Sequence, residues 1–312
     1  MDQQHCDGPQ QESRRTRRGW AVAIGGAMVL GPLAALYASS FVALDRVWRI
    51  DPNYSHGWLV VAASLFFGWR AWHRGGPPWQ SRVRIPEFVL GCSLLAIGLA
   101  MHFLASFFGM LLLDVVALIV ILRAVLLVLG GRAAVRTYGF ACLFPIFMAP
   151  LPVAWYQPLA NVMQHLVTSI SAWTLNAAGV PVFAEGYVLR LPGHSVEMAE
   201  ACSGLRQLTA FLALAVAIGH LTGRAFWFRA ALVALSGFVA LAANCVRVVL
   251  TVLVLVFAGQ RWAQGTFHTV EGLVVVAIGL LMLAAAAWGL CVLEARLRPA
   301  AFAARPECVA GE

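Results

Sequence analysis

The chain has 312 residues, of which 61% are hydrophobic and 12% are charged, and its mean hydropathy is +0.80. Ordinary soluble domains are about 45–50% apolar and about 25% charged, so this composition excludes a soluble enzyme, a disordered chain and a small disulfide-linked secreted module. The net charge is +8. In so apolar a chain this excess indicates membrane topology rather than a nucleic acid partner.

The first 18 residues are polar and rich in arginine, which predicts a disordered cytoplasmic N-terminus. Residues 19–295 are expected to form a single transmembrane domain, and residues 296–312 a cytoplasmic tail. A bilayer-spanning helix needs about 20 predominantly apolar residues. Eight stretches are predicted to cross the bilayer: Trp20–Leu44, Gly57–Trp72, Pro86–Leu104, Met110–Leu129, Tyr138–Val153, Cys202–Leu221, Ala230–Ala258 and Val270–Leu293.

Two segments between the fifth and sixth spans have a different pattern. Trp155–Ala178 has apolar residues at helical spacing on one side and polar residues on the other, which predicts an amphipathic helix lying in the membrane interface. Pro181–Ser195 has β-type residues on both sides of Gly186, which predicts a small periplasmic hairpin. The expected fold is therefore an all-α polytopic membrane protein with about eight transmembrane helices, this interfacial helix and this hairpin.

The arginines indicate the orientation of the eight-span arrangement. With both termini in the cytoplasm, 16 of the 22 arginines lie at cytoplasmic positions or helix ends. This split follows the positive-inside rule and predicts a multi-pass protein of the cell inner membrane. The six on the periplasmic side are Arg46, Arg49, Arg190, Arg206, Arg247 and Arg261.

Polar residues at membrane depth are functional candidates because they are costly to bury there. Three successive spans carry such residues at their periplasmic ends: Cys202, then Asn244 with Arg247, then His268. A thiol, a guanidinium and an imidazole can serve as nucleophile, oxyanion stabiliser and base. Spacing alone also allows Cys202 as a core residue, Arg247 as a partner of Glu271 or Asp114, and His268 as a helix cap.

The literal residues resemble the exosortase/archaeosortase family. The resemblance covers about Asp51 to Gly272, and the order of its motifs on successive spans is specific. They are Glu-Ala-Cys-Ser-Gly-Leu-Arg at 200–206, Asn-Cys-Val-Arg at 244–247, His268 before Gly272, Tyr-Ser-His-Gly at 54–57, and the Phe-Pro…Pro-Leu-Pro stretch at 144–152.

This resemblance implies a membrane-embedded cysteine protease/transpeptidase whose site faces the periplasm. Its substrates would be membrane-anchored proteins with a tripartite C-terminal signal, namely a Pro-Glu-Pro-type motif, a span and an Arg-rich tail. The thiol would form a thioester that passes to an unknown acceptor nucleophile. Carried over by position, Cys202 is the nucleophile, His268 the base and Arg247 the third catalytic residue. Supporting or substrate-binding roles fall to Glu200, Ser203, Arg206, Asn244 and His56.

Two other functions are compatible with the residues themselves. A transporter or channel also has polar residues in its bundle and proline-broken helices, but no internal repeat is present. An envelope polysaccharide polymerase or ligase would use Arg and His on lipid-linked sugars. Only the transpeptidase requires Cys202. No metal or organic cofactor is expected, because the chain has no HExxH, no CxxC and no Gly-rich phosphate loop.

Overall fold

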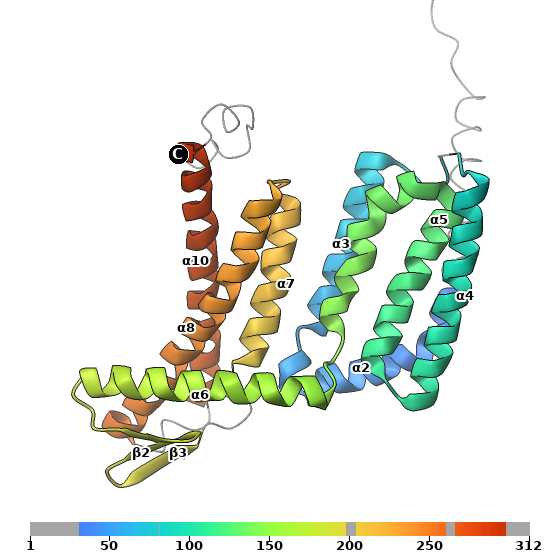
Figure 1. The fold of residues 1–312 in the computed structure, drawn as a ribbon. Helices are drawn as coiled ribbons and strands as arrows, with labels where there is room; N and C mark the ends of the chain where they lie inside the picture. The colour runs from blue at the N-terminus through green and yellow to red at the C-terminus, as the bar shows by residue number, and fades with distance from the viewer. Residues whose placement is uncertain (1–30, 81, 198–203, 260–265, 298–312) are drawn as a thin grey trace, which may run out of the picture. The chain divides into compact units, whose positions relative to one another are not determined.

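The computed structural model describes residues 31–80, 82–197, 204–259 and 266–297. The expected disordered N-terminus at 1–18 lies outside this range, as do residues 298–312 of the expected tail at 296–312 and the first part of the span that starts at Trp20. The chain divides into two compact units, Met1–Val47 and Trp48–Glu312, and apart from most of α2 the elements described below belong to the second unit. The ribbon is shown in Figure 1.

Helices make up most of the described chain. Four of them are long and apolar enough to cross a membrane: Ile85–Phe108, Leu111–Met148, Phe226–Ala258 and Gly272–Arg296. Leu205–Leu221 is a shorter apolar helix. These helices define an all-α membrane protein. The helices with bounds within the described residues are α2 (Ala38–Ile50), α3 (Gly57–Gly75), α4 (Ile85–Phe108), α5 (Leu111–Leu143), α6 (Val153–Ala177), α7 (Leu205–Leu221), α8 (Phe226–Ala258) and α10 (Thr266–Leu297), with the 3-10 turns η1 (Pro52–Tyr54), η2 (Pro78–Gln80) and η3 (Phe144–Met148).

Helix α5 consists of two arms that reverse direction at a glycine. Gly131 leaves helical geometry with φ 62° and ψ −158°, a conformation that only glycine adopts readily. The reversal brings Arg123 of the first arm to the second arm, where its guanidinium donates to the carbonyl oxygen of Gly139 at 3.3 Å. The expected span Met110–Leu129 lies in the first arm, whereas the expected span Tyr138–Val153 is divided between the end of the second arm, η3 and the residues up to the start of α6.

Helices α4 and α5 form a tightly packed hairpin. A methyl group at Gly91 or Gly98 would meet the side chain of Val128 or Ile121 at less than 3 Å, so the two backbones approach closely. Small residues allow such close helix contacts in membranes. Across this interface the buried side chains of His102 and Asp114 form a hydrogen bond, with Nδ1 of His102 at 2.6 Å from Oδ1 of Asp114.

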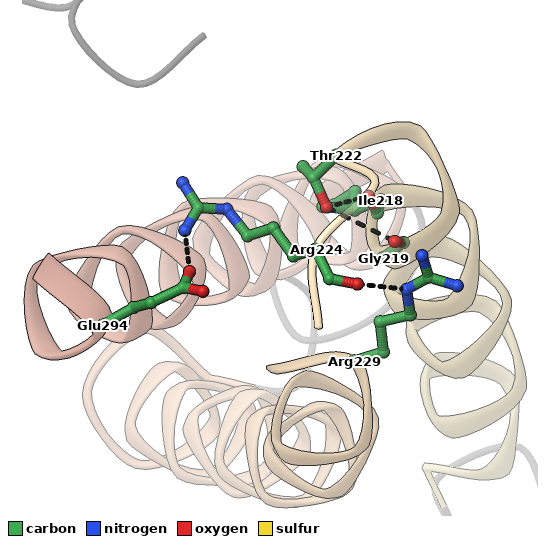
Figure 2. Close-up of polar contacts among 6 residues, drawn as sticks. All are labelled: Ile218, Gly219, Thr222, Arg224, Arg229 and Glu294. Atoms are coloured by element: carbon green, nitrogen blue, oxygen red, sulfur yellow. Dashed lines mark hydrogen bonds and ion pairs between the residues drawn. The ribbon is translucent and has the colours of Figure 1, made fainter. Parts of the chain in front are cut away.

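Helices α7, α8 and α10 pack together around a shared apolar cluster that includes Phe211, Phe228, Leu232 and Val275. At one end of this bundle, Arg224 in the turn before α8 pairs with Glu294 near the end of α10. Figure 2 shows this pair between the two helices. The end of α7, the start of α8 and the end of α10 therefore lie together at this end of the bundle. The start of α7, the end of α8 and the start of α10 lie at the opposite end.

At that opposite end α6 crosses α8, and a small sheet follows it (Figure 1). The sheet is an antiparallel three-stranded meander rather than the expected two-stranded hairpin, in the order β1-β2-β3. Its apolar residues Leu189 and Leu191 pack with Val167 of α6 and with Val248 and Val252 of α8. The strands are β1 (Phe183–Glu185), β2 (Val188–Leu191) and β3 (His194–Glu197), with Phe183 opposite Arg190 and Leu191 opposite His194.

Helix α6 exposes large aromatic side chains and buries several polar ones, unlike a helix on the surface of a soluble protein. Trp155 and Trp173 are 65% and 73% exposed, whereas the polar Gln164, Thr168 and Ser171 are buried. An apolar face turned outward suits lipid contact. The segment thus forms one helix, whose buried face combines Gln164, Thr168 and Ser171 with apolar residues such as Val167 and Leu175.

Candidate active site

The beginning of α7 lies directly against α8. Gly204 caps α7 with φ 80°, and a methyl group added to it would lie 2.8 Å from Nδ2 of Asn244. Asn244 is completely buried. Two of the sequence motifs, Glu-Ala-Cys-Ser-Gly-Leu-Arg and Asn-Cys-Val-Arg, therefore meet through one glycine–asparagine contact, although 40 positions separate the two residues.

Two arginines accompany this contact. Arg247 lies one turn beyond Asn244 on the same face of α8 and is 8% exposed. Its backbone carbonyl accepts a hydrogen bond from the Thr251 hydroxyl at 3.0 Å. Arg206 lies in the first turn of α7 and is half-buried. Both guanidinium groups are permanently charged, so the two arginines bring two positive charges to this end of the bundle.

The Tyr-Ser-His-Gly motif packs against the proline-rich segment. The backbone N–H of Leu151 donates to the Tyr54 hydroxyl at 3.0 Å, and the His56 Nε2 contacts the carbonyl oxygen of Phe147 at 3.1 Å. Asn53 donates to the Tyr156 hydroxyl at the beginning of α6, at 2.9 Å. This loop also borders the start of α7, because α7 contacts η1 and η3.

The packing of Trp48 against Gly57 explains why the Tyr-Ser-His-Gly motif ends in glycine. A methyl group at this position would lie 2.3 Å from Nε1 of Trp48, whose indole covers the start of α3. The same Nε1 donates to the carbonyl oxygen of Met148 at 3.1 Å. Trp48 thus ties the loop at 54–57 to the segment at 144–152, and the two motifs form one local unit.

Burial changes the protonation of this loop. It lowers the pKa of His56, against the opposing effect of the carbonyl groups of Phe147 and Asn53. The imidazole is therefore neutral at pH 7, and because a carbonyl only accepts, Nε2 carries its proton and Nδ1 is an acceptor. Burial also raises the pKa of Tyr54, an effect that the Leu151 N–H opposes. Both side chains are uncharged at neutral pH.

The expected site residues divide into three groups. Glu200, Cys202 and Ser203 lie outside the described residues. His268 is in the first turn of α10, at the same end of the bundle as the start of α7, but its side chain is not described. Arg206, Asn244, Arg247 and His56 are described. Three of them lie at or beside the Gly204 contact, and His56 is in the loop that borders α7.

The structure also shows polar groups that the sequence interpretation did not single out. Asp114 is paired with His102, which accounts for one of the two carboxylates considered as a partner of Arg247. His102 and Asp114 are 12 positions apart with a turn at Gly109 between them, and this spacing is the sequence feature from which the pair could have been predicted. Tyr156 could not be found in this way, because its partner Asn53 is 103 positions away. No group of three His, Cys, Asp or Glu side chains able to hold a metal occurs within the described residues.

The fold and this polar end of the bundle define a polytopic helical membrane protein with a candidate active site. A family model described as a transmembrane exosortase matches residues 48–285. The match covers about three quarters of the chain, and the chain belongs to this family. No curated protein and no solved structure matches the chain.

Proposed function

We propose that this protein is a membrane-embedded cysteine protease/transpeptidase in which Cys202 is the nucleophile, His268 the base and Arg247 the third catalytic residue. The observation that carries the proposal is the contact between Gly204 and Asn244. Consecutive Cα atoms are 3.8 Å apart, so covalent geometry keeps Cys202 within about 8 Å of Gly204. This distance supports a thiol within reach of the part of α8 that carries Arg247.

The positions suit thiol chemistry. Cys202 precedes the N-cap of α7 by two residues, where the positive end of the helix dipole favours a thiolate. His268 takes the thiol proton, and the sulfur attacks the scissile carbonyl. Arg247 stabilises the oxyanion that forms. As the C–N bond breaks, the imidazolium returns its proton to the leaving amine. The acceptor then attacks the thioester, and the sulfur leaves as thiolate.

The substrate is a membrane protein with a C-terminal sorting signal, as membership of the family implies. We propose a tripartite signal with a Pro-Glu-Pro-type motif, a span and an Arg-rich tail. In this topology the chain crosses the inner membrane eight times, through α3, α4, both arms of α5, α7, α8, α10 and the span that begins at Trp20. Both termini are cytoplasmic. The outward apolar face of α6 and the meander then lie at the periplasmic surface, beside the scissile bond.

Cleavage of a tagged substrate tests the proposal. Cells would express the enzyme variants at matched membrane levels with a reporter that ends in the tripartite signal, and immunoblotting would measure the shortened product. Cys202→Ala and Cys202→Ser should abolish shortening. Arg247→Lys should also fail, because an ammonium group cannot reproduce the planar donor fork of a guanidinium. Loss of one oxyanion donor lowers turnover by about 10²–10³ in other enzymes.

The matched controls are the cysteines in helices. Cys92→Ala, Cys142→Ala and Cys291→Ala should be close to silent, because these residues lie within α4, α5 and α10 and outside the motif at 200–206. Shortening at the wild-type rate by Cys202→Ala would refute the thiol mechanism. The transporter and polysaccharide polymerase interpretations would then be preferred.

A further inference from the structure

A second polar region lies at the end of α7 remote from the candidate active site. His220, near the C-terminus of α7, stacks flat on Phe140 of α5, with ring centroids 3.5 Å apart and planes 2° apart. The edge of the same imidazole meets Phe67 of α3, with centroids 5.6 Å apart. These contacts hold His220 between α3 and the second arm of α5.

Three arginines from two other helices surround this imidazole. Arg70 and Arg74 follow Phe67 by three and seven residues, so all three lie on one face of α3. Arg229 of α8 packs its aliphatic stem against Gly219, the residue before His220. The guanidinium groups of Arg229, Arg70 and Arg74 all interact electrostatically with His220. We call Arg70, Arg74, His220 and Arg229 the basic cluster.

No carboxylate compensates the basic cluster within the described part of the chain. The ion pairs there join Arg132 to Glu87, Arg190 to Glu185, Arg224 to Glu294 and His102 to Asp114. Arg229 uses Nε to donate to the backbone oxygen of Arg224 at 2.9 Å, and Figure 2 shows its two terminal nitrogens pointing away from that oxygen. Three permanent positive charges are therefore available to an anion from outside these residues.

The surroundings of the basic cluster indicate the source of that anion. Arg74 is exposed, and Arg70, His220 and Arg229 are partly exposed, so a ligand can reach them. Trp69 and Trp72 on α3 and Phe226 at the start of α8 are exposed aromatic residues, the last at 85%. Exposed aromatic rings beside cationic side chains are typical of the headgroup level of a bilayer. Basic pockets between membrane helices bind anionic lipid headgroups.

We propose that the basic cluster is a binding site for the phosphate of an anionic lipid headgroup. The lipid occupies the junction of α3, α7 and α8 and supplies the counter-charge that the described residues lack. The site lies at the other end of α7 from the proposed nucleophile, and it does not depend on the proposed function.

Lipid retention by the purified full chain tests this site. The protein would be delipidated in detergent and incubated with phosphatidylcholine, with phosphatidylglycerol or with inorganic phosphate at matched ionic strength. Native mass spectrometry would measure bound lipid, and the thermal unfolding midpoint would measure stabilisation by each probe. Wild-type protein should retain phosphatidylglycerol and gain stability from it, whereas phosphatidylcholine should do neither. Equal stabilisation by inorganic phosphate would overturn a lipid site in favour of a free-phosphate site.

Variants locate the effect in the basic cluster. Arg70→Gln and Arg74→Gln remove charges whose side chains form no ion pair or hydrogen bond within the described residues, so the fold should persist. Each should weaken phosphatidylglycerol binding about five-fold, as expected for one basic residue at an anionic surface. Arg70→Lys should retain most of the binding. Unchanged phosphatidylglycerol binding by Arg70→Gln/Arg74→Gln would overturn the proposal.

The matched control removes an arginine outside the basic cluster. Arg136 is exposed on the second arm of α5 and is not among the groups that interact with His220. Arg136→Gln lowers the net charge by the same amount as Arg70→Gln. It should bind phosphatidylglycerol like the wild type. An equal loss in Arg136→Gln would show that total charge rather than this site controls lipid binding.

Discussion

Gly204 and Asn244 touch so closely that no side chain fits between them. A methyl group on Gly204 would lie 2.8 Å from Nδ2, 3.0 Å from Cγ and 3.1 Å from Cβ of Asn244. Asn244 has no exposed surface and lies among packed helices, so it has little room to move. The left-handed φ of 80° adds a second reason for glycine at this position.

Gly204→Ala should therefore be more damaging than the change of a left-handed glycine that has open space around it. The left-handed conformation alone costs about 1–2 kcal/mol, and the contact with Asn244 adds to that cost. Thermal unfolding in detergent and the cleavage assay would both measure the effect. The control is Gly223→Ala, whose φ is 60° but which has nothing within 4 Å of the added methyl group. Equal losses in the two variants would mean that the Asn244 contact is unimportant.

The buried pair of Arg224 and Glu294 should stabilise the α7–α8–α10 bundle. The side chains are 4% and 8% exposed, and the Arg224 guanidinium also lies 4.9 Å from the centre of the Phe228 ring. Glu294→Gln leaves a buried charge without its counter-ion and should cost about 3–5 kcal/mol. The measurement is the unfolding midpoint of the purified protein.

Two controls accompany the Glu294 variant. Arg224→Met/Glu294→Leu should recover much of the lost stability, because replacement of a buried pair by apolar residues is often neutral. Glu185→Gln breaks the pair with Arg190, whose side chains are more than 60% exposed, and should cost no more than about 1 kcal/mol. A midpoint for Glu294→Gln as high as that for Glu185→Gln would contradict the stabilising role.

His56 should make stability dependent on pH. Its pKa is lowered from the ordinary value of 6.5, so the unfolded chain binds this proton more readily than the folded chain. The resulting contribution is complete above pH 6.5 and is lost as the pH falls through the lowered pKa. Wild-type protein should lose more stability between about pH 7.5 and about pH 5.5 than His56→Gln. His73→Gln, on the exposed surface of α3, should follow the wild type; a profile identical in all three proteins would exclude this effect.

The membrane topology can be checked with reporter fusions. The division of 16 and 6 arginines predicts cytoplasmic signals after Arg84 and Arg224, and periplasmic signals after Asp51 and Gly193. Gly193 lies in the turn between β2 and β3, so this fusion also reports the side on which the meander lies. A periplasmic signal after Arg224 would refute the eight-span arrangement.

Cys202 should be more reactive than the other six cysteines. A helix start and a neighbouring imidazole both favour the thiolate. A membrane-impermeant thiol reagent should therefore label Cys202 preferentially, and it should do so more slowly in His268→Ala. Mass spectrometry of the labelled peptides would measure both rates. The same labelling rate with and without His268 would exclude the imidazole as the base.

The local character of most elements could be predicted from the sequence, because apolar runs and 3.6-residue periodicity are properties of neighbouring residues. α4, α8 and α10 contain the predicted spans Pro86–Leu104, Ala230–Ala258 and Val270–Leu293. The predicted spans Met110–Leu129 and Tyr138–Val153 leave a gap between them, and the structure has the reversal within α5 in this gap, at Gly131. The meander differs from the predicted hairpin because β3 pairs with β2 beyond the expected boundary at Ser195.

The sequence by itself determined that this protein is a helical membrane protein, where its helices fall and which motifs carry polar side chains, since composition and periodicity alone decide these properties. Only the tertiary structure decided which polar residues meet. Gly204 contacts Asn244, Asn53 binds Tyr156, and His220 stacks on Phe140 across 40, 103 and 80 positions. It also decided that Gln164, Thr168 and Ser171 of α6 are buried while Trp155 and Trp173 are exposed. The reason is physical: a helical pattern shows that two faces differ, whereas the packing of neighbouring helices and the surrounding lipid select the face that turns inward.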